Sequence, residues 1–157
     1  MGGNGSYYNR NGGVPTERRS HLDTHKHLDG HKILLQRSST KASKNIMNSN
    51  SDSPIYLIAK TKKDGSISIQ KINVFDGHNL KYEINLRFDK HGNLLGYNSG
   101  NHDAGSHAHV WEKGSDGNMH RVRNSSGKEI HMAIPREYHS LINKAVEFNN
   151  KNVKYNG

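Results

Sequence analysis

The sequence predicts an α+β fold in which an antiparallel β-meander is closed by a C-terminal helix packed on the sheet, with a partly flexible N-terminus. Three observations predict this fold. Apolar and polar residues alternate over residues 80–88. Asp-Gly pairs at 64–65, 76–77 and 116–117 separate apolar runs, as tight hairpin turns do. Apolar residues near the end of the chain recur at helical spacing.

The predicted sheet begins with residues 55–60, an apolar run that ends before the first Asp-Gly turn. Ile67 and Ile69 alternate in the next strand, and Ile72 and Val74 continue with the opposite parity. A change of parity within one strand indicates a β-bulge, in which one extra residue is inserted.

The alternation over residues 80–88 is the strongest signal in the chain. The apolar positions are Leu80, Tyr82, Ile84, Leu86 and Phe88, and the intervening and following polar positions are Lys81, Glu83, Asn85, Arg87 and Asp89. Because successive side chains of a strand point to opposite faces, we expect the apolar set in the core and the polar set in water.

A second hairpin and a helix complete the predicted domain. After a turn at 91–93 and a glycine-rich loop, residues 106–113 and 118–123 form strands, and a short segment follows around 130–132. The helix is predicted over 136–149, because proline suits the first turn of a helix and Pro135 precedes this segment. Its apolar face consists of Tyr138, Leu141, Ile142, Ala145 and Phe148.

The N-terminal third is less regular. Residues 1–20 are rich in Gly, Asn and Arg and are predicted to be a flexible basic tail, which leaves 21–157 as a single domain. Residues 33–35 indicate a short strand or a buried turn, and residues 37–53 a loop or a short helix.

Charge and composition limit the classes of partner. The chain has 23 Lys+Arg and 14 Asp+Glu, and the excess lies towards its two ends. A positive field of this kind attracts polyanions, and RNA is the partner that we predict. The chain has no cysteine, no long apolar segment and no secretory leader pattern, so we expect a cytoplasmic protein without disulfides, thiolate-bound metal or membrane contact. Phosphate-binding-loop, nucleophile-elbow and zincin motifs are also absent.

The hairpin at 106–123 carries the candidate chemistry. On a strand, His107, His109, Trp111 and Lys113 share one face. If Asp116-Gly117 is the centre of a two-residue turn, Lys113 pairs with His120, and His120 joins that face.

Two imidazoles and a cation on one surface are what metal-independent RNA cleavage requires. One imidazole removes the ribose 2′-hydroxyl proton and another protonates the leaving oxygen. We assign His107 or His109 as the base, His120 as the acid and Lys113 or Arg121 as the electrostatic stabiliser. If His120 is on the other face, the acid is sought among His102, His131 and the histidines at 21–31.

Further residues are candidates for contact with RNA. Trp111 offers a stacking surface for a base. The basic candidates for phosphate contact are Arg18, Arg19, Lys26, Lys32, Arg121 and Arg123. The cluster His21, Asp23, His25, His27, Asp29 and His31 is either a metal-binding tract or a polar loop.

The same hairpin supports a metal-binding alternative. An H-x-H pattern on a strand presents two imidazoles to a divalent ion, and His120 is the predicted third ligand, with His102 or Asp103 nearby. In this alternative zinc is the cofactor, whereas the ribonuclease needs none.

The block SHAHVWEKGSDGNMHRV resembles the histidine-bearing hairpins of small toxin nucleases, the class that includes barnase, EndoU and colicin-type ribonucleases. The resemblance covers about twenty residues and implies that His107, His109, Lys113 and His120 are catalytic. The composition of the chain is also similar to that of small phage and mobile-element proteins, including anti-CRISPR proteins. That similarity implies a further alternative, an inhibitor that acts on a Cas ribonucleoprotein or its guide RNA.

Overall fold

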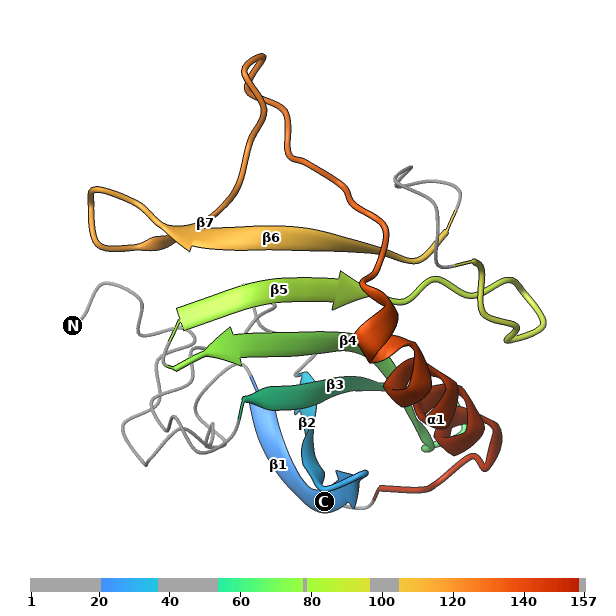
Figure 1. The fold of residues 1–157 in the computed structure, drawn as a ribbon. Helices are drawn as coiled ribbons and strands as arrows, with labels where there is room; N and C mark the ends of the chain where they lie inside the picture. The colour runs from blue at the N-terminus through green and yellow to red at the C-terminus, as the bar shows by residue number, and fades with distance from the viewer. Residues whose placement is uncertain (1–20, 37–53, 78, 97–104, 156–157) are drawn as a thin grey trace.

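The computed structural model describes residues 21–36, 54–77, 79–96 and 105–155. These residues form a mixed, mostly antiparallel sheet of seven strands in sequential order, with one helix near the C-terminal end (Figure 1). The strands are β1 (His21–Leu28), β2 (His31–Gln36), β3 (Ile55–Thr61), β4 (Ile67–Asp76), β5 (Asn79–Asn85), β6 (His107–Lys113) and β7 (Met119–Arg121). The predicted α+β meander is thus confirmed in its broad form. The predicted basic tail, 1–20, lies outside the described residues.

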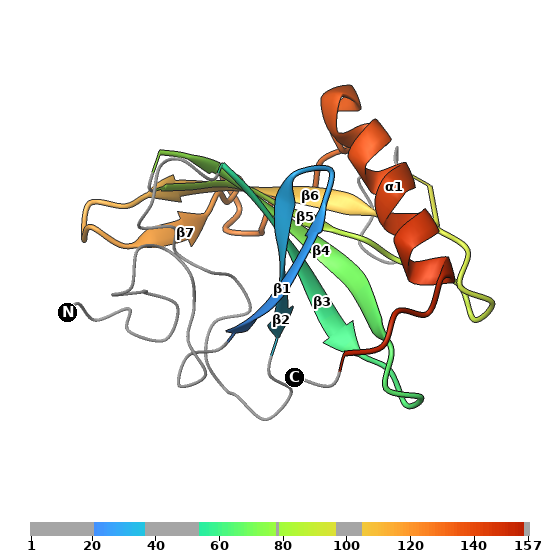
Figure 2. The same ribbon diagram turned by 90° about the horizontal axis from the view of Figure 1, so that it is seen from below.

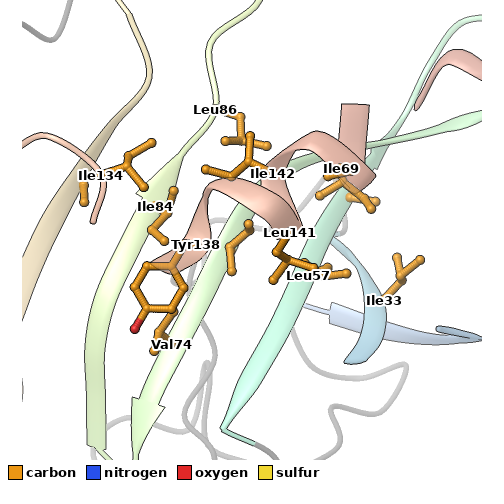
Figure 3. Close-up of a cluster of buried hydrophobic side chains, with 14 of the residues drawn as sticks. Ile33, Leu57, Ile69, Val74, Ile84, Leu86, Ile134, Tyr138, Leu141 and Ile142 are labelled. Atoms are coloured by element: carbon orange, nitrogen blue, oxygen red, sulfur yellow. The ribbon is translucent and has the colours of Figure 1, made fainter. Parts of the chain in front are cut away.

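The helix covers one face of the sheet. A short 3₁₀ turn, η1 (Arg136–Tyr138), leads into α1 (His139–Asn150), which Figure 2 shows lying against one side of the strands. Tyr138, Leu141 and Ile142 point towards the strands that carry Val74 and Ile84 (Figure 3). The apolar face predicted for the helix is therefore confirmed as part of the core.

The predicted bulge in the second strand of the meander is also confirmed. The pairing of β3 with β4 shifts by one residue, because Ile58 pairs with Lys71 and Ala59 with Ile69, which leaves Gln70 as the extra residue. Through this shift the residues on both sides of the bulge, Ile67, Ile69, Ile72 and Val74, all reach the main core. β4 thus contributes side chains to the same core before and after the bulge, although the parity of the apolar positions changes there.

The prediction for the alternating strand was right at most positions and wrong for Leu80 and Glu83. Tyr82, Ile84 and Leu86 belong to the helix-side core as expected. Leu80 pairs with Phe75 after a second register shift and belongs instead to a small apolar cluster on the opposite face. Glu83, expected in water, is fully buried. The face of the sheet away from the helix is therefore also buried in part, and it contains polar side chains. The candidate functional residues described below lie on this face.

The N-terminal hairpin corrects the sequence prediction in two ways. Residues 21–28, considered as a loop, form a full strand that pairs antiparallel with β2 across a bulge between Asp23 and Lys26. β2 then pairs with β3 in parallel, so the sheet is not antiparallel throughout. A stretch of alternating His, Asp and Lys lacks the apolar signature of a strand, which is why β1 was missed.

The C-terminal segment covers an edge of β4. Beyond the end of β5, the side chain of Asn149 pairs with the backbone of Ile69 in β4. Its Oδ1 accepts from the Ile69 N–H at 2.7 Å, and its Nδ2 donates to the Ile69 carbonyl at 3.0 Å. The Ile67 N–H donates to the Val153 carbonyl at 2.9 Å. In the described ranges, no helix has the length and apolar character needed to cross a membrane.

Candidate metal centre

Strand β6 places two histidines on the face of the sheet away from the helix. Ala108 points into the main core and is paired with Ile84, so the alternation of the strand sends His107 and His109 to the opposite side. Both histidines are 1% exposed. Their ring centroids lie 5.0 Å apart. The strand therefore places these two side chains on one face, as predicted.

A third histidine joins them from the segment that follows β7. Met132 and Ala108 exchange two backbone hydrogen bonds of 2.9 Å, which aligns this segment beside β6. Met132 packs on the core side, so His131 points to the other face. The centroid of its ring lies 5.0 Å from that of His107 and 4.5 Å from that of His109.

The three rings bring potential ligand atoms together. One ring nitrogen from each of His107, His109 and His131 lies within 4.8 Å of the other two. Among the described residues this is the one group of three histidine, aspartate or glutamate side chains that meets this spacing.

Hydrogen bonding and burial prepare two of these nitrogens as ligands. His107 Nδ1 lies 3.1 Å from the Gly105 carbonyl, and a carbonyl can only accept, so Nδ1 carries the proton and Nε2 the lone pair. Within the part of the chain that the structure describes, buried His109 Nδ1 has no hydrogen-bond partner. Burial lowers the pKa of His109 to about 4, and the positive charge of Arg121 adds to the shift, although Glu83 opposes it. His109 is therefore a neutral imidazole at neutral pH.

A buried carboxylate organises the groups beside the cluster. Glu83 lies opposite His109 in the pairing of β5 with β6. Its Oε2 lies 3.0 Å from Lys71 Nζ. Arg121 donates to both of its oxygens, from Nε at 3.0 Å and from Nη2 at 2.8 Å. Burial alone would raise the pKa of the Glu83 carboxyl, but the charges and hydrogen bonds of Lys71 and Arg121 outweigh burial and hold it far below its ordinary value.

The single tryptophan belongs to the same network. Trp111 Nε1 donates to Glu83 Oε1 at 2.9 Å. The guanidinium carbon of Arg121 lies 5.9 Å from the centroid of the indole ring. Trp111 and Arg121, predicted to contact RNA, thus make internal contacts with the buried carboxylate of Glu83, which lies opposite His109.

The predicted position of His120 was wrong by one residue of register. Lys113 pairs with Met119, and His120 pairs with Glu112. The turn is longer than expected, because Gly114 N–H donates to the Asn118 carbonyl and leaves a three-residue loop with Gly117 at φ 83°. A slip of one residue reverses the face of every side chain. His120 is therefore exposed on the other face, where its Nε2 contacts Asp116 at 2.9 Å.

The structure describes four of the remaining predicted residues. Lys113 is exposed at the end of β6. Arg123 contacts Glu129 at 3.4 Å, and Lys32 contacts Asp23 at the same distance. Lys26 lies on β1, half-buried. His102, Asp103, Arg18 and Arg19 lie outside the described residues.

The early histidine cluster does not gather into a metal site. Residues 21–31 form β1, the turn and the start of β2, and no three ligand side chains of this described stretch converge. The sequence predicts His131 only as an alternative general acid, not as a partner of His107 and His109. The signal that could have found it is local: apolar Ile130 and Met132 flank it, which indicates a short strand with His131 on its own face. Searches of protein-family models, curated proteins and solved structures found no match to this chain.

Proposed function

We propose that His107, His109 and His131 bind one zinc ion and that the protein is a zinc protein with an open site of the hydrolytic type. The observation that carries the proposal is the convergence of three imidazole nitrogens within 4.8 Å of one another. Zinc takes neutral imidazole nitrogen readily, and sites with three histidines are among its catalytic arrangements.

The spacing of the nitrogens suits a zinc ion after a small adjustment. Two nitrogens bound tetrahedrally at about 2.0–2.1 Å from one zinc lie ~3.4 Å apart. The observed limit of 4.8 Å therefore requires each pair to approach by at most ~1.4 Å. Modest side-chain rotations supply this movement, because the three Cβ atoms project from adjacent strand-like segments on the same face.

The protonation of the ligands also favours a metal. A histidine must be neutral to bind zinc, and a buried neutral imidazole has no proton to lose on binding. The lowered pKa of His109, about 4, meets this condition. The contact from His107 Nδ1 to the Gly105 carbonyl is the kind of outer hydrogen bond that fixes the tautomer of a zinc-binding histidine.

Three protein ligands leave a fourth position for water or substrate. A zinc ion held there would lower the pKa of its bound water to ~7 and would supply a nucleophile at neutral pH. The metal-independent ribonuclease is supported less well, because a general acid and base must reach the substrate. His107 and His109 are each 1% exposed, and His120 lies on the other face.

Metal titration tests the proposal. Chelator-treated protein is titrated with Zn²⁺ by calorimetry and with Co²⁺ by visible absorption, and one ion per chain is expected. His109→Gln should lose this binding, whereas His120→Gln, a histidine of the same hairpin on the opposite face, should retain it. Circular dichroism checks that each variant folds. Equal binding by both variants, or none by the parent protein, refutes the site.

Incubation with RNA separates the hydrolytic alternatives. Cleavage that EDTA abolishes and that His131→Ala lacks is the expected result for a zinc hydrolase acting on RNA. Cleavage that resists EDTA but needs His107 and His109 favours the metal-independent ribonuclease. If free RNA stays intact and an effect appears only when a Cas ribonucleoprotein is added, the inhibitor alternative gains support.

A further inference from the structure

A pocket of about 220 Å³ opens on the same face of the sheet as the three histidines, and His107 forms part of its wall. This volume corresponds to roughly seven water molecules at ~30 Å³ each. Most of the other described lining residues carry charged or amide side chains. A ligand in this pocket would therefore lie next to the candidate metal centre.

The pocket arises from two irregularities of the sheet. Gln70 is the extra residue of the bulge in β4, and it lies where β5 ends at Asn85. Beyond that point Leu86 N–H still donates to the Gln70 carbonyl at 3.0 Å, while Arg87 N–H turns to Ser106 Oγ at 2.9 Å. Bulges are common beside active sites, because they redirect side chains and end strand pairing.

The lining of the pocket is positively charged and rich in donors. Among the described lining residues, Lys60, Lys71 and Arg87 carry positive charges, and Glu83 is the one carboxylate. Lys71 lies 3.0 Å and Arg121 2.8 Å from this carboxylate, so Lys71 offsets the charge of Glu83, and Lys60 and Arg87 supply the excess positive charge of the described lining. The field in the pocket is thus positive, and three side-chain amides add neutral hydrogen-bond donors, from Gln36, Gln70 and Asn85.

We infer that this pocket binds the phosphate group of a phosphate ester and holds it beside the three histidines. Phosphate offers several strong acceptor oxygens, which match converging Lys, Arg and amide donors better than a single-point anion does. The role of this ligand as a substrate rests on the proposed zinc site. Binding of the phosphate itself does not, so the two can fail separately.

Titration of the metal-free protein with inorganic phosphate, followed by calorimetry or NMR, tests the pocket alone. Lys60→Gln and Arg87→Gln should each weaken phosphate binding about tenfold, the scale of one lost charge-assisted contact. Lys113→Gln removes the same charge from an exposed position outside the pocket and should change affinity less than twofold. Absence of binding, or equal weakening by all three variants, overturns the inference. Either result leaves the zinc proposal standing, whereas failed zinc binding with intact phosphate binding overturns the zinc proposal and the role of the ligand as a substrate, but not the phosphate pocket.

Two further ligands identify the source of the phosphate. A nucleoside monophosphate and a short single-stranded RNA are titrated in parallel with inorganic phosphate, using the parent protein and Arg87→Gln. Tighter binding of the mononucleotide than of the RNA, per phosphate, indicates a small ester. Tighter binding of the RNA indicates a chain that passes through the pocket. In both cases Arg87→Gln must lose affinity for the preferred ligand, and an unaffected Arg87→Gln counts against the pocket as the site.

Discussion

Replacement of Glu83 by Gln tests whether the buried carboxylate stabilises the second face of the sheet. The change keeps the shape of the side chain and leaves an oxygen that Trp111 can donate to, but it removes the charge. Lys71, whose side chain is 10% exposed, and Arg121, 29% exposed, then face each other without the negative group between them. Loss of one partner of a buried ion pair costs about 3–5 kcal/mol. We expect the lower end, about 3 kcal/mol, because Arg121 keeps its 2.7 Å contact with Glu129.

A matched variant provides the comparison for this loss of unfolding free energy. Glu129→Gln removes the same charge from a side chain that is 29% exposed and bound to the same arginine. A pair at this exposure contributes up to about 1 kcal/mol. Urea unfolding at neutral pH, followed through Trp111 fluorescence and circular dichroism, measures both variants, with unchanged m-values as the sign of an unchanged folded state. If Glu83→Gln costs no more than Glu129→Gln, the view of Glu83 as the organiser of this face is wrong.

We expect three further outcomes, which concern His109, Asn149 and the binding of RNA. In metal-free protein, lowering the pH from 7.5 to 5.0 should reduce the free energy of unfolding by about 2 kcal/mol through His109, because its pKa is about 4 in the folded state and 6.5 ordinarily. The unfolded chain takes up the proton first, so the loss begins as the pH falls below 6.5. Urea unfolding checks this result, since the stability of His109→Gln should depend on pH less by the same amount. Asn149→Ala should lower stability by about 1–3 kcal/mol in thermal unfolding, because both backbone groups of Ile69 lose their partner, whereas exposed Asn150→Ala should have little effect. Affinity for a structured RNA should fall steeply with salt, since binding releases counterions, and a flat salt response would argue that the +9 charge has no such role.

The parts of the fold that follow from local periodicity were predictable. The bulge at Gln70 was visible as a parity change, because a core needs its apolar side chains on one face. The apolar face of α1 was visible for the same reason at helical spacing. These features depend on residues close in sequence, whose contacts with the core are fixed by the period of the element alone.

The parts that depend on register or on long-range pairing were not predictable. Nothing in the sequence distinguishes a two-residue turn at Asp116-Gly117 from the three-residue loop that forms, and this one residue moves His120 away from the site. Glu83 reads as a surface residue, because its partners Lys71 and Arg121 are distant in sequence and polar themselves. His131 reaches the site only because the chain returns to pair Met132 with Ala108.

The pairing of β4 with the end of the chain has a consequence for synthesis of the protein. Residues 67–69 leave the ribosome long before Asn149 and Val153, which cover their backbone groups in the finished fold. Until then this stretch is an open strand edge, which is a template for pairing with other chains. A chain that stops short of Asn149 would keep that edge exposed while most of the sheet is already present. Such truncated products are expected to aggregate during translation rather than simply to be less stable, and a C-terminal deletion series expressed in cells would reveal a sharp loss of soluble protein at that residue.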